Sequence, residues 1–230
     1  MNALLIAGTD AAVGKTVVAT ALAAYWQTYC AGRSLGIYKP IDTDGRDRDH
    51  YLRLFALNQS PQELSPVCTK TTGDQLPMGD RTTPTIPLDL LWQQFEALTQ
   101  QRDWVLLEGL GGLGTPITHE TILADLAWDW RVPTLLVVPV TTGTVGQAVA
   151  HVALARQCRL HLKGLILNCT QPCTLQQLEE WAPTALIQSL TGVPVLGTVP
   201  FLADPTNPNR LAQVASELML ERILPLSFHS

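Results

Sequence analysis

The chain alternates between short apolar runs and longer amphipathic segments along most of its 230 residues. Six runs are apolar at successive positions, and these are residues 2–7, 35–39, 103–108, 133–139, 162–168 and 193–199. Strands buried on both faces carry this pattern, whereas strands with one solvated face alternate apolar and polar residues. We therefore expect six strands in a sheet that is covered on both sides.

Segments of helix length separate these runs, at residues 14–31, 48–57, 87–101, 121–131, 144–158, 174–191 and 209–223. Strand–helix alternation of this kind predicts an α/β fold, with a mostly parallel sheet and helices on both faces. Residues 60–86 are rich in Pro, Thr, Gly and Asp, and we expect an extended surface loop there. No repeat or linker divides the chain, so a single domain over residues 1–230 is expected.

Composition narrows the classes of function. The formal net charge is −5 and no basic stripe occurs, which argues against a nucleic-acid partner. No apolar run approaches the roughly 20 residues of a membrane span, and the N-terminus reads as a strand rather than a signal peptide. We therefore expect a cytoplasmic protein without a membrane partner. The pair Cys169 and Cys173 lacks the further ligands of a zinc site, so the cysteines are interpreted as reduced thiols.

The stretch "AGTDAAVGKT", at residues 7–16, follows the first apolar run and precedes a helical segment. A strand, a glycine-containing turn, Gly-Lys-Thr and a helix form the context of a phosphate-binding loop. Lys15 would reach the β- and γ-phosphates, and the Thr16 hydroxyl would ligate Mg²⁺. Five residues separate Gly8 from Gly14, where the usual pattern has four. We nevertheless predict that this loop binds a nucleotide.

Two further predicted strands end in residues that could bind a metal ion or a phosphate. Glu108 closes one apolar run and is a candidate Mg²⁺ ligand; the glycines Gly109, Gly111 and Gly112 around it let the backbone approach a ligand. Lys39 ends the second run and would point toward the γ-phosphate if its strand lies beside the loop. Thr43 follows, and Asp49, at the start of a helix, is a candidate second metal ligand. Three other acidic residues are rivals for that role: Asp42, Asp44 and Asp47.

Later strand ends suggest an anion site and a base site. The segment "TTGTVGQ" precedes a helix and exposes N–H groups that would suit a carboxylate or a phosphate. Asn168 ends another strand, and residues 200–204 follow the last one, where an amide and backbone groups could read a purine ring. Each feature could equally be turn chemistry.

Taken together, these segments resemble the dethiobiotin synthetase family, the penultimate enzyme of biotin synthesis. The family's loop reads Gly-Thr-Asp-Thr-x-Val-Gly-Lys-Thr, close to "GTDAAVGKT" here, and shares the long glycine spacing. The other matching segments are "GIYKPI" (36–41), "VLLEGLGGLGTPI" (105–117), "VVPVTTGTVGQA" (137–148), "GLILN" (164–168) and "VPVLGTVPFL" (193–202).

The resemblance implies an ATP-dependent ring closure. The substrate, 7,8-diaminopelargonic acid, takes up CO₂ as a carbamate; ATP phosphorylates the carbamate, and the second amine attacks to close the ureido ring. It also implies a homodimer with the substrate at the interface, so that residues 143–147 act in trans.

The resemblance assigns roles to individual residues of this chain. Lys15 and Lys39 are the catalytic cations, and Thr16, Asp49 and Glu108 hold Mg²⁺. The implied ATP contacts are Ala12, Val13, Gly14, Lys15, Thr16, Val17, Asp49, Glu108, Gly109, Leu110, Gly111, Asn168, Pro200, Phe201, Leu202 and Asp204. The implied substrate contacts are Thr43, Gly111, Gly112, Gly143, Thr144, Val145, Gly146 and Gln147.

Two departures from the family pattern keep other functions open. Ala11 and Ala12 replace residues that are usually polar, and a Pro-x-Ser-Pro-His-like segment is poorly matched within residues 73–87. A pseudoenzyme that binds nucleotide without turnover is therefore one alternative. Another is a ParA- or MinD-like ATPase switch, although the second lysine usual early in that loop is absent. Cobyrinic acid synthases share the loop type, but 230 residues leave no room for their glutaminase domain.

Overall fold

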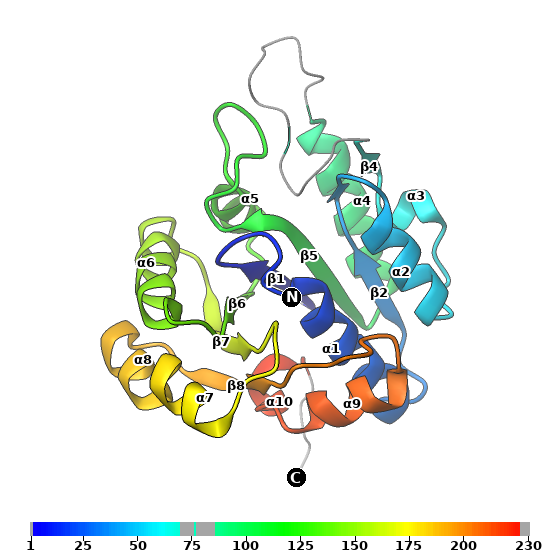
Figure 1. Cartoon of the computed structure of the whole chain (residues 1–230). Helices are drawn as coiled ribbons and strands as arrows, with labels where there is room; N and C mark the ends of the chain where they lie inside the picture. Colours follow the sequence, from blue (N-terminus) through cyan, green and yellow to red (C-terminus); the bar gives the residue numbers. More distant parts are fainter. Residues whose placement is uncertain (1, 70–75, 77–85, 226–230) are drawn as a thin grey trace.

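A computed structural model describes residues 2–69, 76 and 86–225 of the chain (Figure 1). Its central sheet has the strand order β2-β5-β1-β6-β7-β8. Neighbouring strands of this sheet are parallel throughout. The strands are β1 (Ala3–Gly8), β2 (Leu35–Tyr38), β5 (Trp104–Gly112), β6 (Thr134–Pro139), β7 (Leu162–Asn168) and β8 (Val195–Val199). All six expected strands are confirmed.

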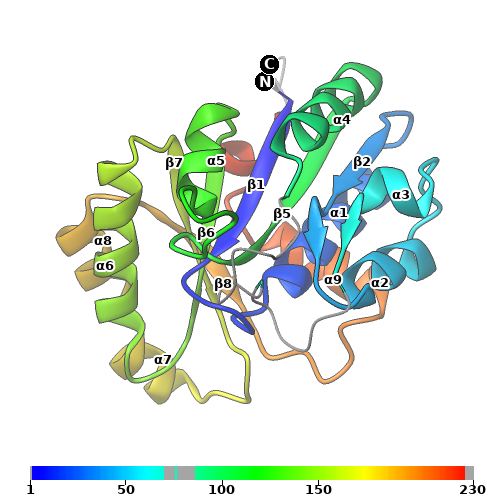
Figure 2. The ribbon, with the colours of Figure 1, turned by 90° about the horizontal axis from the view of Figure 1, so that it is seen from above.

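The sheet is buried on both faces, which explains its uninterrupted apolar runs. Side chains at alternate positions of β1 belong to two separate cores: Leu5 lies in the core that contains Leu91, Leu126 and Ile187, whereas Leu4 and Ile6 lie in the core that contains Val18, Leu22 and Leu211. Figure 2, viewed from above, shows the helices on the two sides of the sheet. Because most positions of these strands are buried, they carry no continuous row of solvated polar residues.

The helices on the first face are α4 (Leu88–Gln101), α5 (Leu123–Asp129), α6 (Thr144–Gln157), α7 (Leu175–Trp181) and α8 (Thr184–Thr191). Those on the second face and its edge are α1 (Lys15–Tyr29), α2 (Arg46–Leu54), α3 (Pro61–Leu64), α9 (Pro208–Ser216) and α10 (Leu220–Ile223). Helix α1 packs against the sheet through buried side chains such as Val18, Leu22 and Trp26.

Two predicted helices are each divided in the structure. The segment 174–191 forms α7 and α8, because Pro183 lacks the N–H that a continuous helix would need and instead precedes the first residue of α8. The segment 209–223 forms α9 and the short α10, with Glu217 closing the first of them. The helix expected from residue 48 begins two residues earlier, at Arg46.

The expectation of an extended surface loop over residues 60–86 is partly wrong. A capping box between Ser60 and Glu63 starts α3. The short β4 (Val67–Cys68) then pairs in parallel with β3 (Ile41–Asp42) in a second, two-stranded sheet. Residues 70–75 and 77–85, and with them most of the poorly matched family segment, lie outside the described residues.

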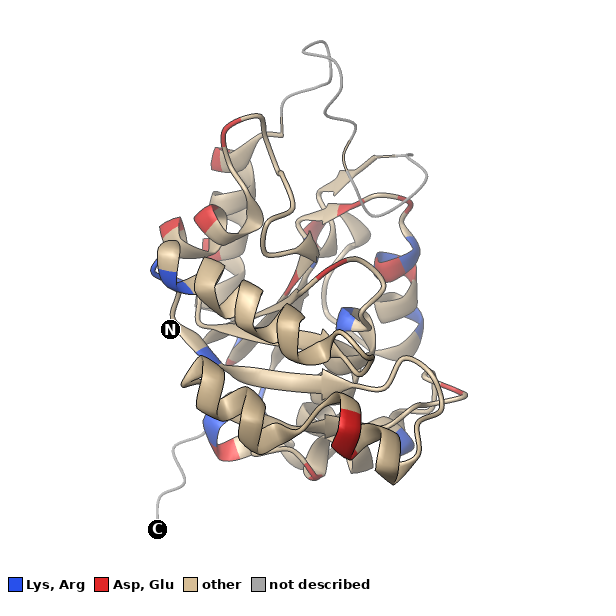
Figure 3. Cartoon of the chain, turned by 60° about the vertical axis from the view of Figure 1, so that its left-hand side comes forward, with Lys and Arg blue, Asp and Glu red and all other residues tan. Residues whose placement is uncertain are grey.

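Lys and Arg are scattered among Asp and Glu over the ribbon (Figure 3). Among the described residues, no helix combines the length and apolar character needed to cross a membrane.

Candidate active site at the carboxyl edge of the sheet

The phosphate-binding loop connects β1 to α1 at the centre of the sheet. Gly14 has φ +88°, a left-handed conformation that favours glycine, and a Cβ there would collide with the side-chain amide of Asn168. The Asn168 amide donates to the Val13 carbonyl at 2.8 Å, so β7 supports the loop directly. Lys15 is buried, with its ammonium 3.0 Å from the Asp10 carbonyl oxygen. The loop is therefore held in one conformation by its own backbone and by the neighbouring strand.

Parallel pairing brings the second lysine and the strand-end carboxylate to the same loop. Ile6 of β1 is in register with Glu108 of β5, and Leu107 of β5 is in register with Tyr38 of β2. Lys39, which follows Tyr38, is therefore level with Glu108 at the edge where the phosphate loop begins. Open parallel sheets bind their ligands beyond this edge. The register alone thus places Lys39 beside Glu108.

A buried cluster of charged and hydroxyl groups results. Lys39 Nζ lies 2.9 Å from Glu108 Oε1 and 2.6 Å from Asp47 Oδ2. The Thr16 hydroxyl lies 2.9 Å from Glu108 Oε1 and 3.2 Å from Asp47 Oδ1. Tyr51 donates its phenol hydroxyl to the other oxygen of Glu108, Oε2. The two carboxylates are therefore bound to a lysine, a threonine and a tyrosine from three different elements.

Mutual pairing fixes the charges of this cluster. Burial alone would lower the pKa of Lys39, but Glu108 and Asp47 outweigh it and raise that pKa above its ordinary value. Burial would likewise raise the pKa of Asp47, yet Lys39 and the Thr16 hydroxyl hold it below its ordinary value. Burial and the nearby Glu108 raise the pKa of Tyr51 well above 10. At neutral pH Lys39 is therefore a cation, Asp47 an anion and Tyr51 a neutral donor.

The candidate metal ligand on α2 is Asp47 rather than the predicted Asp49. Asp49 lies two residues further along the helix, about 200° around its axis. Its carboxylate is 69% exposed and pairs with Arg48 at 2.9 Å, away from the cluster. The prediction placed the start of this helix at residue 48, whereas α2 begins at Arg46, and it is Asp47 that faces the cluster.

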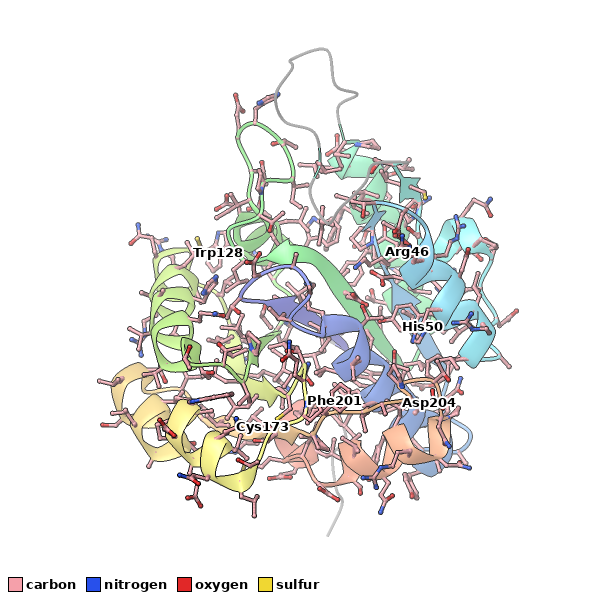
Figure 4. All side chains as sticks on the ribbon, viewed as in Figure 1. Arg46, His50, Trp128, Cys173, Phe201 and Asp204 are labelled. Carbon is pink, nitrogen blue, oxygen red and sulfur yellow. The ribbon has the colours of Figure 1, made fainter. Side chains whose placement is uncertain are left out.

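A cleft of about 310 Å³ opens beside the cluster. Of the predicted site residues, it is lined by Ala12, Gly14, Lys15, Thr16, Val17, Lys39, Thr43, Glu108, Leu110 and Gly111. The three rival acidic residues, Asp42, Asp44 and Asp47, also line it, as does Arg46, for which no role was predicted. Arg46 stands at the start of α2 with an exposed guanidinium that pairs with Asp44 at 2.8 Å (Figure 4).

A second hollow, of about 210 Å³, lies on the other side of the phosphate loop. The structure brings together here the predicted base-reading residues Asn168, Pro200, Phe201 and Leu202. Asp204 is further along the same connection, toward α9, and its carboxylate accepts hydrogen bonds from Thr206 (Figure 4). Asp204 is thus part of a local turn and does not line the hollow.

The glycines at the end of β5 differ in their contacts and backbone conformation. The carbonyl oxygen of Gly109 lies 3.4 Å from Lys39 Nζ. Gly111 has φ +59° and lines the cleft. The N–H of Gly112 is donated to the Thr115 hydroxyl at 2.8 Å, so Gly112 does not offer the free backbone donor that the sequence suggested.

The N-terminus of α6 lies near the loop within the same chain. Gln147 accepts a hydrogen bond from the Thr9 hydroxyl at 2.8 Å. The Thr144 side chain is buried and donates to the Pro139 carbonyl, and a side chain at Gly146 would meet open space. None of the predicted residues Gly143, Thr144, Val145, Gly146 and Gln147 lines the cleft of their own chain.

The cluster suits a magnesium ion. Two carboxylates and a hydroxyl are hard oxygen ligands, and Mg²⁺ in nucleotide sites is held by one or two carboxylates together with phosphates and waters. The described residues contain no group of three or more His, Cys, Asp or Glu able to hold a metal by themselves. Thr16, Asp47 and Glu108 therefore fit an ion that arrives with a nucleotide.

Sequence reasoning missed Asp47 as the preferred ligand and missed Tyr51 altogether. The four-residue spacing of Asp47 and Tyr51 places them on one face of α2, but the contact of Tyr51 with Glu108 cannot be read from that spacing. Lys39, the lysine predicted to point toward the γ-phosphate, is 3% exposed.

The described cysteines are all free thiols. Burial raises the pKa of Cys169 to about 11, so this thiol is protonated at neutral pH.

Comparison with known proteins gives consistent results. Residues 2–209 match a family model described as "AAA domain". A protein of Gloeothece citriformis, named ATP-dependent dethiobiotin synthetase BioD, is 49% identical over 98% of this chain and 100% of its own length. A protein of the same name from Synechocystis sp. is 42% identical over 96% of this chain and 94% of its own length.

Solved structures share the fold at low sequence identity. The MinC:MinD cell division protein complex of Aquifex aeolicus matches over 100% of both chains, with a TM-score of 0.60 and 15% identity. A ParA family ATPase of Chlorobium tepidum matches over 96% of both chains, with a TM-score of 0.57 and 10% identity. At these identities the similarity extends to the architecture alone.

Proposed function

The chain belongs to the dethiobiotin synthetase family, and we propose that it closes the ureido ring of dethiobiotin from 7,8-diaminopelargonic acid, CO₂ and ATP. The observation that carries the proposal is the meeting of Lys15, Lys39, Asp47 and Glu108 at the phosphate loop, in a chain 49% identical to a named synthetase. The ATPase-switch alternative rests on shared architecture alone.

The proposed reaction has three steps. One amine of the substrate adds to CO₂ and loses a proton, which gives a carbamate. A carbamate oxygen attacks the γ-phosphorus of ATP and ADP leaves, which gives a mixed carbamic–phosphoric anhydride. The second amine then attacks the carbonyl carbon, phosphate leaves, a proton is lost and the ring closes.

The residues of the cleft match the charges that develop in these steps. The transferred phosphoryl group and the carbamate are both anions, so catalysis depends on positioning and on cations rather than on a protein nucleophile. Lys15 and Lys39 both line the cleft and would supply positive charge to these anions. Mg²⁺ held by Thr16, Asp47 and Glu108 would neutralise charge on the β- and γ-phosphates.

Substrate and base contacts complete the proposal. The buried Thr43 and the Gly111 backbone line the cleft where the diamine would lie. The hollow formed by Asn168, Pro200 and Phe201 would take the adenine ring. We further propose a homodimer in which residues 143–147 of the partner bind the substrate carboxylate.

The test is release of phosphate from Mg-ATP, with and without the diamine and bicarbonate, alongside detection of dethiobiotin by mass. The proposal predicts that phosphate and dethiobiotin appear together and only when the diamine is present. Slow phosphate release indifferent to the diamine would instead favour an ATPase switch. Bound nucleotide without any release would favour a pseudoenzyme.

Subunit mixing tests the proposed dimer. Gly146→Trp fills open space within its own chain and would block the substrate carboxylate on the partner's side. Mixing this variant with Lys39→Met should restore activity, because one site of each mixed dimer then carries neither change. If the mixture is as inactive as each variant alone, the two residues serve the same subunit's site.

A further inference from the structure

Tyr51 lies behind the cleft rather than in it. Its side chain is fully buried in the second turn of α2, packed among the apolar residues between this helix and the sheet. Its phenol hydroxyl nevertheless points at the carboxylate of Glu108 and donates to Oε2. The phenol hydroxyl of Tyr51 is therefore a buried polar group that does not line the cleft.

The two oxygens of Glu108 have separate sets of partners. Oε1 receives the Thr16 hydroxyl and the Lys39 ammonium, both of which line the cleft. Oε2 receives the hydroxyl of Tyr51 from the interior. The carboxylate is thus oriented with one oxygen toward the cleft and the other toward the core.

Without the tyrosine, this orientation would lose its support. Glu108 is 1% exposed, so water cannot readily replace a lost partner. A carboxylate oxygen left unpaired in such a place is costly, and the group would turn toward its remaining donors. Such a turn would draw Oε2 into competition for Thr16 and Lys39.

Helix α2, which carries Tyr51, also positions the carboxylate of Asp47. Asp47 and Tyr51 are one helical turn apart on α2, so they reach the cluster side by side. The bond from Tyr51 to β5 therefore fixes the distance between the helix that carries Asp47 and the strand that carries Glu108.

We propose that Tyr51 is a positioning residue for the metal site, which holds Glu108 so that Oε1 alone faces a divalent ion and keeps α2 at the spacing that lets Asp47 share it. This inference rests on the proposed magnesium-dependent function. Partners that orient metal ligands from behind typically change metal affinity by about 10–100-fold when they are removed.

The test is Mn²⁺ binding in the presence of ADP, measured by electron paramagnetic resonance on the whole protein. Tyr51→Phe removes only the hydroxyl, and we expect the Mn²⁺ dissociation constant to rise about tenfold or more. Tyr38→Phe is the matched control, because Tyr38 is also fully buried and donates its hydroxyl to the Leu91 carbonyl at 2.9 Å. This control should bind Mn²⁺ as the wild type does.

A double-mutant cycle separates positioning from general loss of stability. If Tyr51 acts through Glu108, adding Tyr51→Phe to Glu108→Gln should change Mn²⁺ affinity less than it does in the wild type. Activity provides a second measurement: the Mg²⁺ concentration for half-maximal turnover should rise in Tyr51→Phe, while turnover at saturating Mg²⁺ stays near that of the wild type.

Equal Mn²⁺ affinity in the Tyr51 and Tyr38 variants would overturn the inference. So would a loss of affinity in Tyr51→Phe that is the same with and without Glu108. Failure of the proposed function would look different, because the wild type itself would then make no dethiobiotin, whatever the two tyrosine variants bind.

Discussion

Replacing Lys39 with methionine tests the electrostatics of the cleft most directly. Methionine has a similar length and fills the same space without a charge, so the change removes the shared partner of Asp47 and Glu108. The Lys39 and Glu108 side chains are 4% and 1% exposed, so their pairing is a buried one. The Asp47 side chain is 30% exposed, and water can partly replace the lysine there.

Breaking a buried ion pair by removing one partner typically costs about 3–5 kcal/mol, because the other charge is left unpaired. For a chain of this size, about 2–4 °C of Tm accompanies each kcal/mol, so Tm should fall by about 6–20 °C. Total stability is on the order of 5–15 kcal/mol, and the variant should therefore still fold.

The loss of stability in Lys39→Met should depend on pH, and the pKa shifts of Asp47 and Lys39 give its direction. The pKa of Asp47 is lowered in the fold, so its pairing stabilises the wild type above the unfolded value of about 4 and is lost as pH falls through the lower folded value. The pKa of Lys39 is raised, so its contribution is full below about pH 10. The gap between wild type and variant should therefore be largest at pH 7–9 and shrink on acidification, as the unpaired Asp47 carboxylate takes up a proton.

Urea unfolding at pH 4.5, 7 and 8.5 measures this gap. Lys163→Met is a suitable control, because Lys163 is half-buried and its ammonium donates to the Ile223 carbonyl instead of a carboxylate. Phosphate release should fall by about 10²–10³-fold in Lys39→Met, the usual effect of deleting one charge-stabilising donor. The account of the cluster is refuted if the unfolding free energy of Lys39→Met at pH 8.5 lies within about 1 kcal/mol of the wild-type value. This threshold is set above the effect of an ordinary surface substitution.

Three further changes probe single positions. Glu108→Gln keeps an acceptor for Thr16 but removes the charge, so the Mg²⁺ requirement for phosphate release should rise about tenfold or more; an unchanged Mg²⁺ titration would exclude Glu108 as a ligand. Asp47→Asn should weaken Mn²⁺ binding in the presence of ADP whereas Asp49→Asn should not, and the reverse order would restore the assignment made from sequence. Gly14→Ala places a Cβ against the Asn168 amide at φ +88°, so calorimetry should detect at least tenfold weaker ADP binding and a lower Tm; wild-type affinity would mean that the loop is not held as described.

Sequence patterns predict most of this fold because the sheet is buried on both faces. In such a sheet a continuous apolar run indicates a strand that is buried on both faces, and all six strands were predicted from such runs. The helix break at Pro183 was readable in principle from the missing N–H. The strands β3 and β4 were not, because two residues each are too short to carry a period.

The site was harder to predict than the fold. The lysines and Glu108 follow from strand ends, because parallel strands bring such residues to one edge. Choosing between Asp47 and Asp49 needed the first residue of α2, and helix ends are the least certain feature of a sequence-based prediction. The role of Tyr51 depends on a contact between α2 and β5, 57 residues apart in the chain, which no local pattern encodes.

The pairing of Lys39 with both carboxylates means that the proposed metal site already contains a positive charge. If Thr16, Asp47 and Glu108 hold Mg²⁺ as we propose, the ion would take the place of a cation rather than add charge to an open acidic pocket. The Lys39 ammonium would then be available to an anion in the cleft. Binding of the ion and the availability of Lys39 for the transferred group would thereby be linked.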